Sequence, residues 1–138
     1  MTVLESFFHN VKKASLYKTS PMYVMDQEPF INSAFLGFFP GQEDIESARR
    51  LLALINDIES RFGRDRERER RWGERYLDID ILLFGSLIIN EEDLVIPHQR
   101  LRERAFALEP LLEIYPSAME PGTHVPYSDF LSILSGQV

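Results

Sequence analysis

Residues 71–82 read Arg71-Trp72-Gly73-Glu74-Arg75-Tyr76-Leu77-Asp78-Ile79-Asp80-Ile81-Leu82, an arginine-rich loop that runs directly into an apolar segment with two carboxylates. The apolar segment, from Tyr76 to Phe84, is typical of a buried strand, whose side chains alternate between two faces. Alternation puts one set of side chains on the face that carries the carboxylates: Tyr76, Asp78, Asp80, Leu82 and Phe84. The other set is apolar throughout: Leu77, Ile79, Ile81 and Leu83.

Asp78 and Asp80 are the candidate metal ligands. Two carboxylates side by side on a half-buried strand repel each other, and desolvation raises the cost of ionising both. A divalent cation relieves both effects, and Mg²⁺ prefers hard oxygen ligands. Arginines directly upstream can bind a phosphate in a bidentate manner, and a metal beside them is typical of phosphoryl-type transfer. The simpler alternative is a pair of edge-strand aspartates in solvent, which their apolar neighbours disfavour.

This stretch resembles the signature of the 6-hydroxymethyl-7,8-dihydropterin pyrophosphokinases, enzymes of folate biosynthesis. The positions that carry the resemblance are Arg71, Gly73, Glu74, Arg75, Asp78, Ile79, Asp80, Ile81 and Leu82. Further matches are Pro97-His98 and Arg104-Ala105-Phe106 downstream, and Tyr17-Lys18-Thr19-Ser20-Pro21 and Asn32 upstream. The resemblance extends from about residue 13 to the end of the chain.

The resemblance implies a reaction in which pyrophosphate passes from ATP to the hydroxymethyl group of the pterin, and AMP is released. It implies two Mg²⁺ ions held by Asp78 and Asp80. The catalytic residues it implies are Arg64, Arg75, Asp78 and Asp80. The residues it implies for ATP are Glu59, Arg71, Trp72, Arg75, Ile81, His98 and Arg104. Those it implies for the pterin are Thr19, Phe30, Asn32, Trp72 and Phe106, with Phe30 and Phe106 on the two faces of the ring.

The composition predicts one soluble domain over residues 1–138, without cysteine chemistry, because the chain has no Cys. The net charge of -7 argues against general nucleic-acid binding, although the arginines gather around residues 61–75 and suggest a local anion site. A solvated loop, with Asp65, Glu67 and Glu69 interleaved, is the alternative for that run. No apolar run is long enough to span a membrane, and the start has no secretory pattern, so we expect a cytoplasmic protein.

The predicted fold is α+β, a ferredoxin-like sandwich with helices packed on a mostly antiparallel sheet. The expected helices are one through Val3–Val11, then Ile45–Phe62, Ala105–Ile114 (shortened or split by Pro110) and Pro126–Leu134. The expected strands are Ala14–Thr19, Asn32–Phe39, Tyr76–Phe84, with Leu87–Ile89 pairing back on it, and Leu94–Ile96.

The beginning of the chain departs from the family, which starts with a strand ending in Gly-Ser-Asn followed by a helix. Residues 1–8 resemble the end of that helix, so we expect the first strand to be missing and its neighbours to be unpaired. A monomer is expected for the complete enzyme, and association for this chain. The alternative function is therefore a truncated, weak or inactive remnant that binds or self-associates, and an RNA-binding module is a further rival that the net charge opposes.

Overall fold

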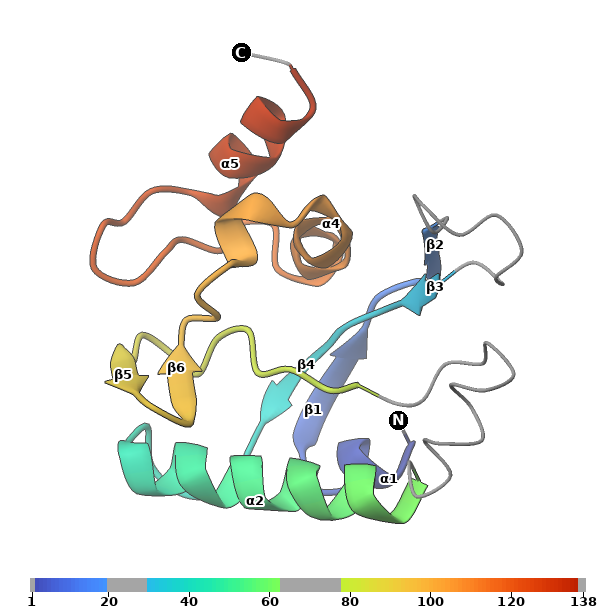
Figure 1. Ribbon diagram of the computed structural model, residues 1–138, viewed down its shortest axis with the longest axis vertical. Helices are drawn as coiled ribbons and strands as arrows, with labels where there is room; N and C mark the ends of the chain where they lie inside the picture. Colours follow the sequence, from blue (N-terminus) through green and yellow to red (C-terminus); the bar gives the residue numbers. More distant parts are fainter. Residues whose placement is uncertain (1, 20–29, 63–77, 137–138) are drawn as a thin grey trace.

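The structure, a computed structural model, describes residues 2–19, 30–62 and 78–136. The described residues form an α+β arrangement of short antiparallel strand pairs and helices (Figure 1). The helices are α1 (Thr2–Glu5), α2 (Ile45–Phe62), the 3-10 turn η1 (Leu101–Glu103), α4 (Ala105–Ile114) and α5 (Tyr127–Leu134). The strands are β1 (His9–Lys13), β2 (Tyr17–Thr19), β3 (Phe30–Asn32), β4 (Phe35–Phe38), β5 (Ile89–Glu91) and β6 (Leu94–Ile96).

The first four strands form a bent antiparallel ribbon. β1 pairs with β4, and β2 pairs with β3. Between the two pairs, Ala14 N–H donates to Ala34 O at 2.9 Å, and the Ser33 hydroxyl donates to Ala14 O at 3.1 Å. The ribbon passes between α2 on one side and α4 on the other (Figure 1). The predicted strand Ala14–Thr19 is thus shortened to Tyr17–Thr19, and the predicted strand Asn32–Phe39 is interrupted at the bend.

The helix predicted through Val3–Val11 is wrong beyond Glu5. Phe7 and Phe8 N–H donate back to Leu4 and Glu5 carbonyls in a turn, and β1 begins at His9. Phe8 then packs edge-on against Phe35, with ring centroids 5.0 Å apart. A short run with helical spacing is overridden because residues 9–13 pair their backbone with β4, and a helix this short is marginal by itself.

Helix α2 begins and ends where the sequence predicts, at Ile45 and Phe62. Asp44 caps it, because its Oδ1 accepts a hydrogen bond from Ser47 N–H at 2.9 Å. That bond is the main reason why the pKa of Asp44 is lowered. The buried stripe of the helix consists of Ala48, Leu51, Ile55 and Ile58, which pack toward α1, β4 and residues 79–84.

The strand predicted for Tyr76–Phe84 is only partly supported. Its described part, residues 78–84, belongs to no strand ladder within the described residues. The alternation holds at first, because Ile79 and Ile81 pack on the α2 side and Leu82 packs on the α4 side. It is wrong at the end: Leu83 joins Leu82, and Phe84 packs with α2, because a turn follows in which Leu87 N–H donates to Phe84 O.

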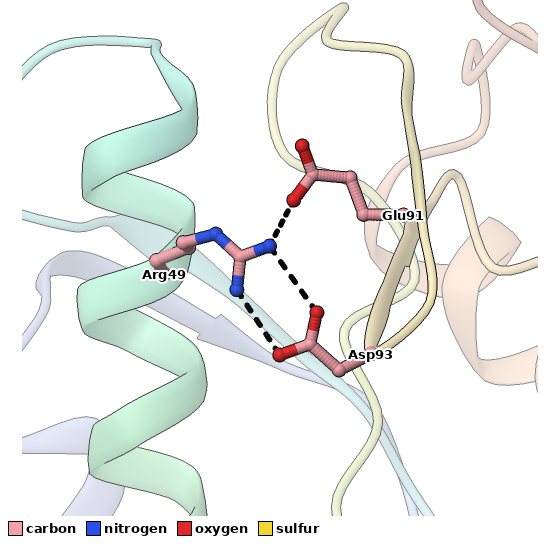
Figure 2. Close-up of polar contacts among 3 residues, drawn as sticks. All are labelled: Arg49, Glu91 and Asp93. Atoms are coloured by element: carbon pink, nitrogen blue, oxygen red, sulfur yellow. Dashed lines mark hydrogen bonds and ion pairs between the residues drawn. The ribbon is translucent and has the colours of Figure 1, made fainter.

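The β5–β6 hairpin pairs within itself, and the predicted pairing of Leu87–Ile89 with the preceding segment is not found for its described part, residues 78–84. The hairpin is joined to α2 by Arg49, which points toward both Glu91 and Asp93 (Figure 2). Arg49 Nη1 and Nη2 donate to the two Asp93 carboxylate oxygens at 3.1 and 3.2 Å, and Nη2 also donates to Glu91. These bonds raise the pKa of Arg49, so the guanidinium is charged at any practical pH.

Helix α4 continues through Pro110 without interruption, so the expected shortening is wrong. Pro110 is fully buried, and Leu108 and Leu111 beside it lie in a core cluster with Leu101, Ala118 and Tyr127. The burial of this face offsets the backbone hydrogen bond that proline cannot donate. Helix α5, Tyr127–Leu134, follows Pro126 as its N-cap, one residue later than predicted.

Candidate functional site

Asp78 and Asp80 both lie exposed at the start of the extended residues 78–84. The side chain of Asp80 is 48% exposed. Ile79 between them is turned the other way, into the core beside α2. The two carboxylates therefore remain open to a ligand and to water, while the residue between them anchors the backbone.

Glu59, on the last part of α2, fixes this backbone. Its Oε2 accepts a hydrogen bond from Ile79 N–H at 2.6 Å, and the carboxylate is half-buried. Hydrogen bonds from a backbone N–H to a carboxylate belong to the stronger, charge-assisted kind. Glu59 thus contacts the peptide between the two aspartates, whereas its predicted contact with ATP remains a prediction.

His98 lies against the same segment. The backbone N–H of His98 donates to Leu82 O at 2.9 Å. In the imidazole ring, Nδ1 accepts a hydrogen bond from the backbone N–H of Arg100 at 3.3 Å. Because Nδ1 is an acceptor, Nε2 carries the ring hydrogen when the imidazole is neutral. Nε2 faces Asp80 Oδ2 at 4.0 Å, which brings together two residues that are 18 positions apart in the sequence.

Four of the five predicted pterin residues, all except Trp72, lie on the β2–β3 hairpin and on α4, which contacts both strands. Asn32 is half-buried and pairs with Tyr17 in the ladder, and Thr19 pairs with Phe30 at the other end. Phe106 is 42% exposed in the first turn of α4, and the Arg104 guanidinium lies 5.5 Å from its ring centroid. An exposed aromatic ring and a half-buried amide on two touching elements are suited to a flat polar heterocycle.

Other predicted positions are not tested by this geometry. Arg64, Arg71, Trp72 and Arg75 lie outside the described residues, as do the side chains of Thr19 and Phe30. Ile81 packs its side chain into the core beside α2, so a contact with ATP would have to come from its backbone and stays a prediction.

The chemistry of the two aspartates fits Mg²⁺. This ion is commonly held by one or two carboxylates, with waters and phosphate oxygens completing the octahedron. Within residues 2–19, 30–62 and 78–136, no three Asp, Glu, His or Cys side chains gather as a metal cage. Two exposed carboxylates supply only part of a coordination shell, which favours an ion that is also bound by a phosphate ligand over a structural metal ion.

Glu113 forms a polar cluster that no local pattern singles out. It lies on the last turn of α4 and accepts hydrogen bonds from Ser15 and Tyr17, which are 98 and 96 residues away. In the sequence it is one more exposed glutamate on a helix. Only the fold brings its three partner groups together.

Comparisons with known proteins show the family of this chain. Residues 1–116 match the family model described as 7,8-dihydro-6-hydroxymethylpterin-pyrophosphokinase (HPPK). The chain belongs to this family. It is 38% identical over 117 residues to the 2-amino-4-hydroxy-6-hydroxymethyldihydropteridine pyrophosphokinase of Haemophilus influenzae, which covers 85% of this chain and 69% of that protein. It is 40% identical over 116 residues to the protein of the same name from Methylorubrum extorquens, over 83% of this chain and 68% of that one.

A longer relative is the mitochondrial folate synthesis bifunctional protein of Pisum sativum. The identity is 35% over 127 residues, which is 91% of this chain but 23% of the pea protein. The chain therefore spans about two thirds of the bacterial HPPK relatives and less than a quarter of the pea protein. Among the described residues, no helix has both the length and the apolar character needed to cross a membrane.

Proposed function

We propose that this chain transfers pyrophosphate from ATP to the hydroxymethyl group of 6-hydroxymethyl-7,8-dihydropterin. The hydroxymethyl oxygen forms a bond to the β-phosphorus of ATP and loses its proton. The bond from that phosphorus to the oxygen bridging the α-phosphate breaks, and AMP leaves with the electron pair. Family membership supports the reaction, and the observation that carries it in the structure is the pair of open aspartates beside His98.

The nucleotide phosphates are proposed to lie along Asp78 and Asp80. When bound, Mg²⁺ neutralises phosphate charge and orients the phosphate oxygens. The chain itself presents two carboxylates, and Glu59 holds the backbone between them through Ile79 N–H. His98 turns its Nε2 toward the Asp80 carboxylate. Arg64, Arg71 and Arg75 are proposed to bind phosphate oxygens, and Arg75 to stabilise charge as the group transfers.

The pterin is proposed to lie between the β2–β3 hairpin and α4. Asn32 would pair with the donor and acceptor edge of the ring, and Phe106 would cover one face. The same hairpin carries Thr19 and Phe30 at its far end, which supports their assignment to this ligand. Trp72, His98 and Arg104 are proposed to complete the ternary site, and the complete enzyme is proposed to act as a monomer.

The finer architecture is also a proposal: a ferredoxin-like sandwich with a further strand between β4 and residues 78–84. Two features support it. Both segments pack their inner residues, Phe35 and Ile79, in one core against α2. Within the described residues, β4 has one ladder partner, β1, and residues 78–84 have none.

The test of the function is turnover by Asp78→Asn and Asp80→Asn, with Asp129→Asn on α5 as a matched control for an exposed aspartate. Loss of either metal ligand is expected to lower the rate at least about a hundredfold, because several kcal/mol of transition-state stabilisation depend on it. Circular dichroism and thermal melts check that each variant is folded. Near-normal turnover in either folded variant would remove the metal assignment.

A further inference from the structure

We propose that Glu113 is a positioning residue for the pterin. Its hydrogen bonds hold the bend between β1 and β2 against α4, and so set the distance between Asn32 and Phe106. This inference rests on the proposed function, because it uses the proposed position of the pterin beside the β2–β3 hairpin and α4. Glu113 itself is not proposed to touch the ligand.

The first observation is the number and direction of the hydrogen bonds. Both carboxylate oxygens of Glu113 accept from Ser15 N–H, at 3.0 and 3.1 Å, and Oε2 also accepts from the Ser15 hydroxyl at 3.0 Å. Oε1 accepts from the Tyr17 hydroxyl at 2.7 Å. A single carboxylate therefore binds the backbone, a hydroxyl and a phenol of one short segment, which fixes that segment in orientation as well as in distance.

The second observation is the location of these donors. Ser15 lies in the bend between β1 and β2, where the Ser33 hydroxyl also donates to Ser15 O at 3.2 Å. Tyr17 begins β2 and pairs directly with Asn32 in the ladder. A displacement of Ser15 or Tyr17 relative to α4 would therefore be passed to Asn32 through one ladder step.

The third observation concerns the other end of α4. Glu113 lies in the last turn of the helix, and Phe106 lies in its first turn. The helix is rigid, and its inner face is buried at Leu108 and Leu111. Hydrogen bonds that fix the hairpin against the last turn of α4 therefore also fix its position relative to the first turn. The hydrogen bonds also lower the pKa of Glu113, with Tyr17 as the largest cause and Ser15 N–H next, so the carboxylate is an ionised acceptor at neutral pH.

The experiment compares Glu113→Ala, Glu113→Gln and Tyr17→Phe with Glu109→Gln, a matched control one helical turn earlier and exposed on the same helix. Calorimetry measures the Kd of the pterin in the presence of Mg²⁺ and a non-hydrolysable ATP analogue, and the Kd of the nucleotide alone. Hydrogen exchange of the Ser15 amide, measured without any ligand, reports on its hydrogen bond to Glu113. Urea unfolding checks that each variant is folded.

Glu113→Ala is expected to weaken pterin binding about ten- to a hundredfold, because displacement of a positioning group by about 1 Å has effects of that size. Nucleotide Kd is expected to stay within about twofold, as in the control, since the bonds of Glu113 go to Ser15 and Tyr17, which are not among the residues proposed for the nucleotide. Tyr17→Phe should have a smaller effect, and the double variant Glu113→Gln with Tyr17→Phe should be less than additive because the two groups act as one unit. The Ser15 amide should exchange faster in Glu113→Ala only.

Unchanged pterin Kd in a folded Glu113→Ala variant would overturn the positioning role while leaving the proposed function intact. Equal weakening of pterin and nucleotide binding would also overturn it, because the effect would then be general. If the unaltered chain bound nucleotide but no pterin, the proposed function would fail, and the positioning role toward this ligand with it. Faster exchange of the Ser15 amide in Glu113→Ala would in that case still show that Glu113 holds this segment, so that only the assigned ligand would be wrong.

Discussion

Replacement of Glu59 separates two roles for this residue, support of the backbone between the aspartates and contact with ATP. Its Oε2 accepts from Ile79 N–H at 2.6 Å from a half-buried position. A hydrogen bond to a charged group contributes about 1.5–3 kcal/mol, and its loss leaves the Ile79 amide without that acceptor. For a domain of this size each kcal/mol corresponds to roughly 3–4 °C, so Glu59→Ala should lower the Tm by about 5–10 °C.

Glu59→Gln keeps an acceptor oxygen and removes only the charge, so the expected loss is smaller, about 0.5–1.5 kcal/mol. Glu46→Gln is the control, since Glu46 is exposed in the first turn of the same helix, where the charge contributes only about 0.3–1 kcal/mol through the helix dipole. Urea unfolding at neutral pH gives the free energies, and titration with a non-hydrolysable ATP analogue and Mg²⁺ gives the nucleotide Kd.

The support role predicts that stability and nucleotide affinity fall together in Glu59→Ala, and that both are largely retained in Glu59→Gln. An equal free energy of unfolding for Glu59→Ala and Glu46→Gln would refute this reasoning. If Glu59→Gln lost nucleotide affinity at unchanged stability, direct contact with ATP would be the role of Glu59 instead.

Three further predictions concern the fold. Leu108→Ala removes a fully buried side chain from the core beneath α4, and its loss should cost about 2–5 kcal/mol, measured by urea unfolding; a loss below about 1 kcal/mol would contradict the packing described. Arg49→Ala should lower the Tm only slightly and less at high salt, because its bonds to Glu91 and Asp93 are exposed, and a loss independent of salt would contradict an electrostatic link. The pKa of Glu113 is lowered in the folded state, so the ionised carboxylate contributes to folding stability at pH values above its ordinary pKa of about 4.3. This contribution is lost as the pH falls through the folded pKa. The difference in urea midpoint between the unaltered chain and Glu113→Gln should therefore shrink between about pH 6 and pH 3. A constant difference over that range would contradict the assigned bonds.

Elements whose burial pattern is local were predictable from the sequence. Helix α2 follows from a regular apolar stripe that ends at Phe62, and α4 follows from its spacing despite Pro110. The exposure of both Asp78 and Asp80 also follows from their spacing, because they flank the partly buried Ile79 in an alternating segment, whereas their role as metal ligands stays a prediction. How much of each carboxylate is covered depends on distant segments of the chain, and the sequence of residues 78–84 does not contain that information.

Features that depend on distant partners could not be predicted. Residues 9–11 read as the continuation of a helix, and only the pairing of β1 with β4 makes them part of a strand. Phe84 reads as a neighbour of Asp80, but the turn at Gly85, whose φ of 56° favours glycine, reverses the chain and sends Phe84 toward α2. Glu59 and Glu113 were two glutamates among several on helix surfaces, and each gained a specific role from partners 20 and 96–98 residues away.

Product analysis tests the central claim most directly. The chain is incubated with ATP, Mg²⁺ and 6-hydroxymethyl-7,8-dihydropterin, and nucleotides and pterins are separated by chromatography. The account predicts AMP and pterin diphosphate in equal amounts, both absent with Asp80→Asn. ADP with a pterin monophosphate, or no product from a folded chain that binds both substrates, would contradict it.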